Sequence, residues 1–150
     1  MAADDEEAIV AACAGSRLAL IAESFARLTG RRLVEAMLWD APRVILAHGT
    51  QDDPLFFYGN RMALDLFEMP ARDFLGMPSR FTAEAPSREA RARLLEQVTR
   101  DGYIGDYAGV RISATGRRFR IERATVWTLV DTAGRSHGQA ATFDQWTALD

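Results

Sequence analysis

The closest grouping of a histidine with carboxylates in this chain is His48 with Asp52 and Asp53. An imidazole beside a carboxylate can act as a general base or contribute to a metal site. The same residues before Pro54 also suit a polar turn, in which aspartate side chains accept hydrogen bonds from backbone amides. Two hypotheses therefore stay open here: a small enzyme of unknown reaction that uses His48 with Asp52 or Asp53 in a cavity, or a turn without chemistry.

A second candidate is the arginine-rich segment 117–123, where Arg118 and Arg120 alternate with Phe119 and Ile121. In a strand, this alternation places the two arginines on the face opposite to the apolar side chains. Guanidinium groups there could bind an anion or a partner, or the face could simply be solvated. The formal net charge of -3 disfavours nonspecific attraction to phosphate backbones, so we expect no nucleic-acid partner.

Aromatic residues recur along the chain and could line a small-molecule cavity or fill a core. We assign no catalytic residue and no metal ligand. As a ligand-binding hypothesis we select mostly polar side chains that could orient a small molecule: Asn60, Arg80, Tyr107, Arg111, Ser113, Trp127 and Gln139.

The single cysteine, Cys13, excludes a disulfide within the chain and a cysteine-rich zinc site. No apolar run approaches the length of about 20 residues that a membrane span needs, and the segment Met1–Glu7 is acidic, unlike the start of a secretory signal. We therefore expect a cytoplasmic protein without a membrane partner. The absence of lysine and the many alanines suggest a GC-rich, bacterial genome.

We next consider the elements that must position these residues. Residues 1–15 are expected to form an acidic, frayed lead before the first helix. Apolar spacing predicts a helix over 16–29, capped by Ser16 and stopped by Gly30. A short helix is predicted over 33–39. From Val44 onward the pattern indicates strands over 44–47 and 55–58, then a helix capped by Asn60.

Further along, a single helical turn is predicted over 71–76 and a solvated amphipathic helix from Ser87 to Gly102. Three strands should follow over 107–113, 119–130 and 139–146, joined by hairpin turns. Unbroken alternation would place Trp127 on the same face as Phe119 and Ile121, and buried.

This order predicts an α+β fold for a single domain over 16–150. It has one mostly antiparallel sheet of about five strands, short helices on one face, and the amino-terminal helix available for the other.

The order of elements, with Asn60 opening a helix after the second strand, resembles the PAS fold. More specifically, the chain resembles the MEKHLA domain, a PAS-related family of stand-alone bacterial proteins and of plant class III homeodomain-leucine zipper proteins. The most specific matches are the stretches 107–121 and 138–146. The other matching residues are Leu38, Trp39, Ala41, Ala47, His48, Gly49, Thr50, Asp53, Pro54, 58–63, Pro78, Ser79, Arg80 and Trp127.

The resemblance implies a sensory or regulatory module that binds a small ligand or a regulatory protein partner, and whose output passes through a partner or through self-association. It implies no established reaction. Light-sensing PAS domains carry their reactive cysteine in the central helices and haem-binding ones carry a histidine on the long helix. This chain has neither, so we expect no haem and no covalent flavin. The apolar stripe of the flanking helix, including Ile21 and Phe25, predicts a homodimer.

Overall fold

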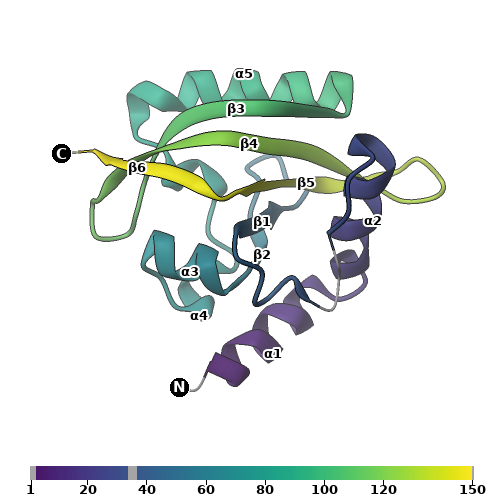
Figure 1. The fold of residues 1–150 in the computed structure, drawn as a ribbon, viewed down its shortest axis with the longest axis horizontal. Coiled ribbons are helices and arrows are strands. Elements are labelled where there is room, and N and C mark those ends of the chain that lie inside the picture. Colours follow the sequence, from purple (N-terminus) through teal and green to yellow (C-terminus); the bar gives the residue numbers. More distant parts are fainter. Residues whose placement is uncertain (1–2, 34–36, 150) are drawn as a thin grey trace.

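The computed structural model describes residues 3–33 and 37–149, in which an antiparallel sheet is packed between helices (Figure 1). The sheet has six strands, in the order β2-β1-β5-β4-β3, with β6 paired to β4. The PAS-like α+β prediction is confirmed. The elements are α1 Ala3–Ala14, α2 Arg17–Thr29, β1 Val44–His48, β2 Phe56–Gly59, α3 Arg61–Phe67, α4 Ala71–Phe74, the 3-10 helix η2 Ser79–Thr82, α5 Ala85–Asp101, β3 Tyr103–Ile112, β4 Arg118–Val130, β5 Ser136–Phe143 and β6 Gln145–Leu149.

The amino-terminal lead differs from the expected frayed segment, because it forms helix α1 and packs against β2 and α4. Val10 on α1 is fully buried, and the Glu6 carboxylate accepts a hydrogen bond of 2.6 Å from the Ala71 amide. Gly15, with φ of +57°, separates α1 from α2. Among the described residues no single helix is long and apolar enough to span a membrane; α1 and α2 meet that criterion only together, and they are bent by 74°.

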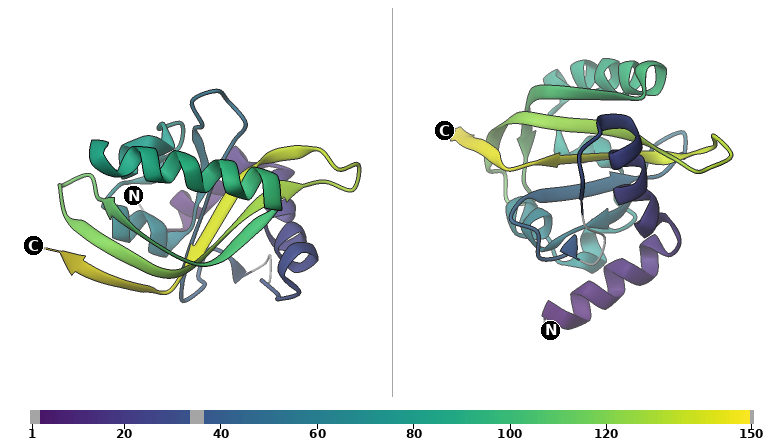
Figure 2. Two further views of the ribbon diagram at one scale, coloured as in Figure 1. Left: turned by 90° about the horizontal axis from the view of Figure 1, so that it is seen from above. Right: turned by 45° about the vertical axis from the view of Figure 1, so that its right-hand side comes forward.

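Helix α2 covers the outer face of the sheet, as its apolar stripe predicts. Phe25 makes an edge contact with Trp127, with ring centroids 4.7 Å apart, and the Trp127 indole donates a 3.3 Å hydrogen bond to the Ile21 carbonyl. Gly30 ends the helix in the left-handed conformation, as predicted. Ser16 makes no side-chain capping bond, because its backbone is already helical. Figure 2 shows α2 and α5 against different parts of the sheet.

Trp127 is fully buried, as predicted, but the predicted face is wrong. Arg123 adopts a positive φ of 53°, and the β3–β4 pairing shifts between the Gly109–Ile121 and Tyr107–Ala124 pairs. The extra residue in β4 forms a bulge, which reverses the alternation of side chains beyond it. Ile121 therefore faces inward with Val126, whereas Trp127 faces α2.

The predicted last strand is divided at Asp144 into β5 and β6, which makes six strands instead of about five. Both segments pair with the same edge of β4: β5 with the part after the bulge, over 125–130, and β6 with the part before it, over 118–122. Because β4 bends at Arg123, one straight strand could not follow its whole length. The short helix predicted over 33–39 includes residues 34–36, which lie outside the described part of the chain.

The inner face of the sheet carries α3, α4, η2 and α5. Asn60 is fully buried and begins α3, and its side-chain oxygen accepts hydrogen bonds from the amides of Ala63 and Ile45, both at 3.1 Å. Its amide nitrogen donates to the carbonyls of Leu38 and Arg43 at 2.9 and 2.8 Å. Asn60 thus ties the start of α3 to β1 and to the segment before it.

Candidate ligand-binding cavity

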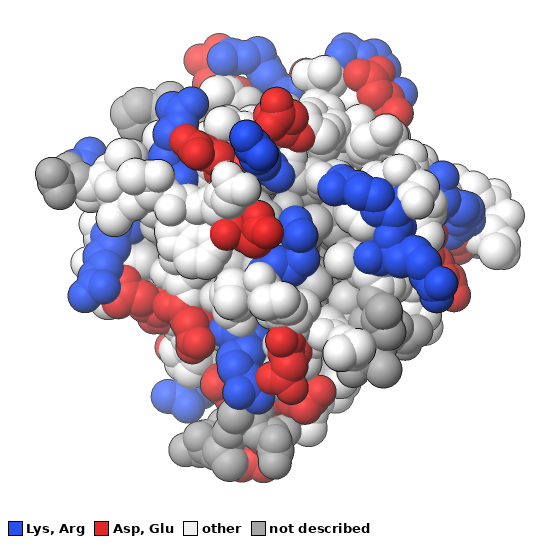
Figure 3. All heavy atoms as spheres, in the orientation of Figure 1, with Lys and Arg blue, Asp and Glu red and all other residues white. Residues whose placement is uncertain are grey.

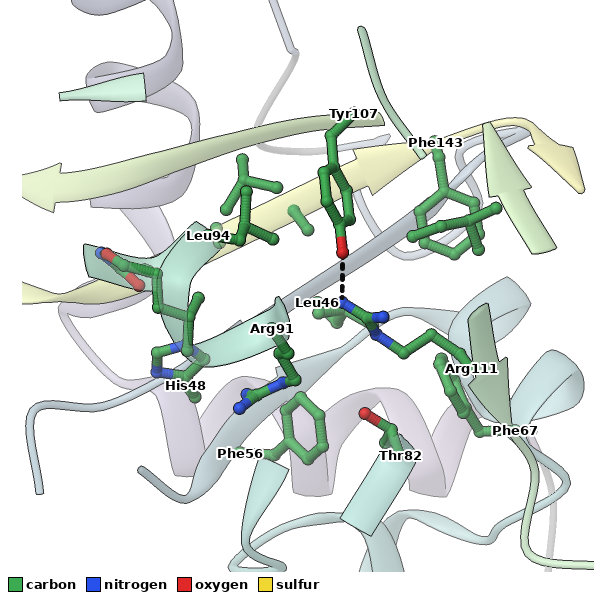
Figure 4. Close-up of a pocket in the computed structure, with 16 residues that line it drawn as sticks. Leu46, His48, Phe56, Phe67, Thr82, Arg91, Leu94, Tyr107, Arg111 and Phe143 are labelled. Atoms are coloured by element: carbon green, nitrogen blue, oxygen red, sulfur yellow. Dashed lines mark hydrogen bonds between the residues drawn. The ribbon is translucent and has the colours of Figure 1, made fainter. Parts of the chain in front are cut away.

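A cavity of about 60 Å³ lies between the inner face of the sheet and helix α5 (Figure 4). Because one enclosed water requires at least about 10–15 Å³ and takes up about 30 Å³ in the liquid, the cavity has room for a few water-sized groups. Apolar side chains form most of its wall, and the polar ones come from β1, η2, α5, β3 and β5. The lining residues are Leu46, His48, Phe56, Phe67, Thr82, Arg91, Leu94, Leu95, Tyr107, Arg111, Ile121, Val126, Gln139, Ala140, Ala141 and Phe143.

Two arginines line this cavity from different elements, Arg91 from α5 and Arg111 from β3 (Figure 4). Each is only 9% exposed. The Arg91 guanidinium donates to the Ser79 hydroxyl, and the Arg111 guanidinium donates to the Val110 carbonyl at 2.8 Å and to the Tyr107 hydroxyl at 3.3 Å. Burial, and secondarily the positive charge of Arg111, lowers the pKa of Arg91 to about 10, so Arg91 remains protonated at neutral pH.

Tyr107 holds the Arg111 guanidinium inside the cavity, and Gly109 leaves room for this arrangement. A β-carbon at Gly109 would lie 2.4 Å from the Tyr107 hydroxyl oxygen and 3.1 Å from a terminal nitrogen of Arg111. Any side chain at position 109 would therefore displace both groups. The absence of a side chain at Gly109 thus allows Tyr107 and Arg111 to take their positions in the cavity.

His48 also lines the cavity, but none of the described carboxylates is paired with it. Its Nδ1 lies 3.1 Å from the Gly49 carbonyl, which identifies Nδ1 as the protonated nitrogen of the neutral ring. Nε2 is buried and has no hydrogen-bond partner among the described residues. Burial lowers the pKa of His48 to about 4, with the nearby Arg91 charge acting in the same direction and the Gly49 carbonyl opposing it.

The two aspartates grouped with His48 in the sequence lie elsewhere. Asp53 binds Arg80 at 3.1 Å on the surface, and Asp52 is exposed. The histidine–carboxylate pair that the enzyme hypothesis requires is therefore not formed by His48 with Asp52 or Asp53.

Three of the seven proposed ligand-binding residues line the cavity: Tyr107, Arg111 and Gln139. The Gln139 amide nitrogen donates to the Leu95 carbonyl at 3.1 Å and to the Thr99 hydroxyl at 2.9 Å, which ties β5 to α5. The cavity therefore brings together residues from β3 and β5 that are distant in the sequence.

The other four proposed residues lie outside the cavity. Asn60 is used in the helix cap, Trp127 faces α2, and Arg80 pairs with Asp53 at the surface. Ser113 donates a 2.7 Å hydrogen bond to the Glu68 carboxylate. The hydrogen bonds of that carboxylate with Thr115 and Ser113 lower the pKa of Glu68.

Sequence reasoning missed Arg91, the buried cation contributed by α5. A signal was present, because Arg91 precedes Leu94 by three residues and Val98 by seven, so it stands on the apolar stripe of an amphipathic helix. An arginine on that stripe indicates a buried guanidinium rather than a solvated one. The prediction of a solvated helix from Ser87 to Gly102 does not use this signal.

The surface arginines of β4 have acidic neighbours. Arg118 lies 3.8 Å from Glu84, and Arg120 lies 3.8 Å from Glu122. Figure 3 shows acidic and basic side chains interspersed over one face of the molecule. This arrangement supports the solvated-face interpretation of the arginine-rich segment. Across the described residues, no group of three or more histidine, cysteine or acidic side chains could hold a metal ion, and Cys13 is exposed on α1.

Comparison with known sequences places this architecture in a family. A family model described as "MEKHLA domain" matches residues 16–148. The homeobox-leucine zipper protein ATHB-9 of Arabidopsis thaliana is 30% identical over 112 residues, which cover 73% of this chain and 13% of the plant protein. HOX9 of Oryza sativa subsp. indica is 27% identical over 113 residues, covering 74% and 13%. The chain thus spans only a small part of the length of these relatives.

Solved structures show the same fold at low sequence identity. The PAS domain of a Colwellia psychrerythraea protein superposes with a TM-score of 0.63 at 10% identity, covering 76% of this chain and 92% of that one. A light-oxygen-voltage domain studied with a flavin analogue gives a TM-score of 0.62 at 14% identity, covering 77% and 84%. The light-state dimer of the fungal blue-light photoreceptor Vivid gives 0.56 at 15% identity, covering 69% and 77%.

Proposed function

The chain belongs to the MEKHLA domain family, and from this premise we propose that it is a sensory or regulatory module that binds a small ligand in the cavity beside α5. The observation that carries the proposal is the cavity itself, whose mostly apolar wall contains a few oriented polar groups. Ligand sites commonly combine these two features. Because α5 and β3 both contribute side chains, a bound molecule would change how the helix packs on the sheet.

A flavin does not fit this cavity. Its volume of about 60 Å³ is far below what a three-ring isoalloxazine requires, and the buried guanidiniums of Arg91 and Arg111 occupy the polar part. Cys13, on α1, does not line the cavity. The expectation of no covalent flavin and no haem therefore stays a prediction, and an absorbance spectrum of protein expressed with both cofactors available tests it. A Soret band or a light-bleached flavin band would contradict it.

A homodimer and a regulatory protein partner belong to the same proposal. The similarity in fold to the Vivid light-state dimer supports self-association. The stripe that suggested a dimer through α2 is used within the subunit, since Ile21 and Phe25 are buried against Trp127. We therefore expect a dimer to use another surface. Light scattering at increasing concentration checks this, and a chain that stays monomeric throughout would contradict it.

The cavity is tested by filling it. Ala141 lines the cavity and is paired in register with Leu46 and Val126, so Ala141→Leu places extra volume inside. Ala148 on β6 is exposed, and Ala148→Leu is the matched control. Native mass spectrometry of protein purified from its own host should show a retained small molecule in the natural chain and the control but not in Ala141→Leu. Equal retention by all three proteins would place the ligand elsewhere, and the proposal would fail.

A further inference from the structure

The cavity contains two buried positive charges, and the described part of the chain gives neither of them a negative partner. Arg91 and Arg111 form no ion pair with any carboxylate of the described residues. Asp53 acts on Arg91 only at a distance, because its carboxylate binds Arg80 at 3.1 Å. Elsewhere, ion-paired arginines such as Arg61 with Asp40 and Arg93 with Glu89 lie at the surface, where water also solvates them. Arg91 and Arg111 are thus the two most buried arginines, and no described carboxylate compensates their charge.

Buried charges in proteins are normally paired, because removing an ion from water costs several kcal/mol unless an opposite charge and hydrogen bonds replace the water. Each guanidinium has five N–H donors, of which Arg91 uses one and Arg111 two in hydrogen bonds within the described chain. Both groups line the same cavity. Unused donors and uncompensated charge therefore face the same small space.

We infer that the cavity binds a short-chain monocarboxylate, whose carboxylate group accepts hydrogen bonds from Arg91 and Arg111. This inference rests on the proposed ligand-binding function and specifies its ligand. The planar, forked guanidinium matches the two oxygens of a carboxylate. The apolar wall, which includes Leu46, Phe56 and Leu94, suits a short hydrocarbon chain better than a second charged group.

The size of the cavity limits the ligand. Room for a few water-sized groups corresponds to a small molecule such as acetate or propionate. A dicarboxylate would place its second charge against the apolar wall without a partner. The inferred class is therefore a monoanion with a short apolar tail.

The test is calorimetric titration of the full chain with sodium propionate, with propionamide and sodium chloride as controls of shape and of ionic strength. Propionate should bind saturably, and propionamide, of nearly the same shape but uncharged, should bind at least about tenfold more weakly. The same titration is carried out with sodium sulfate and with sodium phosphate. Equal binding of propionate and propionamide would overturn the inference, and so would binding of inorganic oxyanions alone.

Substitution of the arginines separates a ligand-binding role from a structural one. Arg91→Met and Arg111→Met should each weaken propionate binding at least about tenfold, and Arg91→Lys, which keeps the charge but loses the fork, should weaken it less than Arg91→Met does. Arg93→Gln is the matched control, since Arg93 is exposed on the same helix and pairs with Glu89 at 3.0 Å. Unchanged binding in Arg91→Lys, Arg91→Met and Arg111→Met would overturn the inference.

A second readout does not depend on the ligand. If Arg91 is a buried charge that awaits an anion, Arg91→Met should raise the melting temperature of ligand-free protein while removing the stabilisation by propionate. A purely structural Arg91 would give a lower melting temperature in the variant with the propionate effect retained. The protein could instead retain another molecule, with retention abolished by Ala141→Leu and unaffected by the arginine variants. That outcome would overturn this inference and leave the proposed function standing. Failure of the cavity-filling test itself would remove both.

Discussion

His48 is 7% exposed, and burial is the largest cause of its low pKa of about 4. An unfolded histidine titrates near 6.5, so between pH 6.5 and 4 the unfolded chain binds a proton that the folded chain does not bind. The free energy of unfolding should therefore fall as the pH is lowered through this window, by about 3 kcal/mol in total from this one residue.

Urea unfolding at pH 7.5 and at pH 4.5 measures this effect. His48→Gln removes the titrating group, so the variant should lose less stability between the two pH values than the natural chain does. The carboxylates titrate alike in both proteins and cancel in the comparison. His137→Gln is the control, because His137 lies near the surface beside Asp131 and His48 remains in place. An identical loss in His48→Gln and the natural chain would show that His48 is protonated in the folded state.

Asn60 and Ser16 stand at equivalent positions before α3 and α2, and only the first acts as a side-chain cap. Asn60→Ala removes four hydrogen bonds, three of them buried, and leaves backbone groups of β1 and α3 without these partners. We expect a loss of about 2 to 4 kcal/mol in urea unfolding, against less than about 0.5 kcal/mol for Ser16→Ala. Equal losses would show that Asn60 contributes no more than an ordinary surface residue.

At the scale of elements, the bulge in β4 decides which side chains face α2 and which face the cavity. Arg123 occupies this bulge with φ of +53°, a conformation that costs a non-glycine residue about 1 to 2 kcal/mol. Arg123→Gly should relieve this strain and leave stability unchanged or raise it by up to about 1 kcal/mol.

Arg120→Gly is the matched control in the same strand, because Arg120 is exposed and lies in the regular pairing with β6. Glycine there should lower the free energy of unfolding by about 0.5 to 1 kcal/mol. Thermal or urea unfolding of the two variants compares them directly. If Arg123→Gly is the more damaging change, the bulge does not sit at Arg123.

At the scale of the whole molecule, α1 lies outside the segment 16–148 matched by the family model, yet it packs onto β2 and α4. Val10 is fully buried and its neighbour Ile9 is 37% exposed. Val10→Asp places a charge in the core and should cost at least about 2 kcal/mol or release α1, whereas Ile9→Asp should change stability by no more than about 0.5 kcal/mol.

Urea unfolding measures both variants, and limited proteolysis reports whether α1 detaches. Cleavage before Gly15 should become faster in Val10→Asp than in the natural chain. Equal stability and equal cleavage for the two aspartate variants would mean that the amino-terminal segment is the frayed lead that its acidic composition suggests.

Features that depend on near neighbours could be predicted from the sequence. Periodicity and stop residues located α2, α3 and α5, short apolar runs located β1 and β2, and the position of Asn60 identified it as a helix cap. These features arise from contacts within a few residues, so the local pattern contains them. The α+β order followed, because amphipathic elements in this sequence can bury their apolar faces only against one sheet.

The environments of the side chains, in contrast, depend on contacts between elements that are distant in the sequence. Trp127 faces α2 because β4 has a bulge in its pairing with β3. The predicted last strand divides into β5 and β6 because β4 bends there. The cavity brings together Arg91, Arg111 and His48 from three elements. Whether a guanidinium or an imidazole lies in water or among apolar side chains depends on residues distant in sequence, and this burial sets its charge, its pKa and its need for a partner.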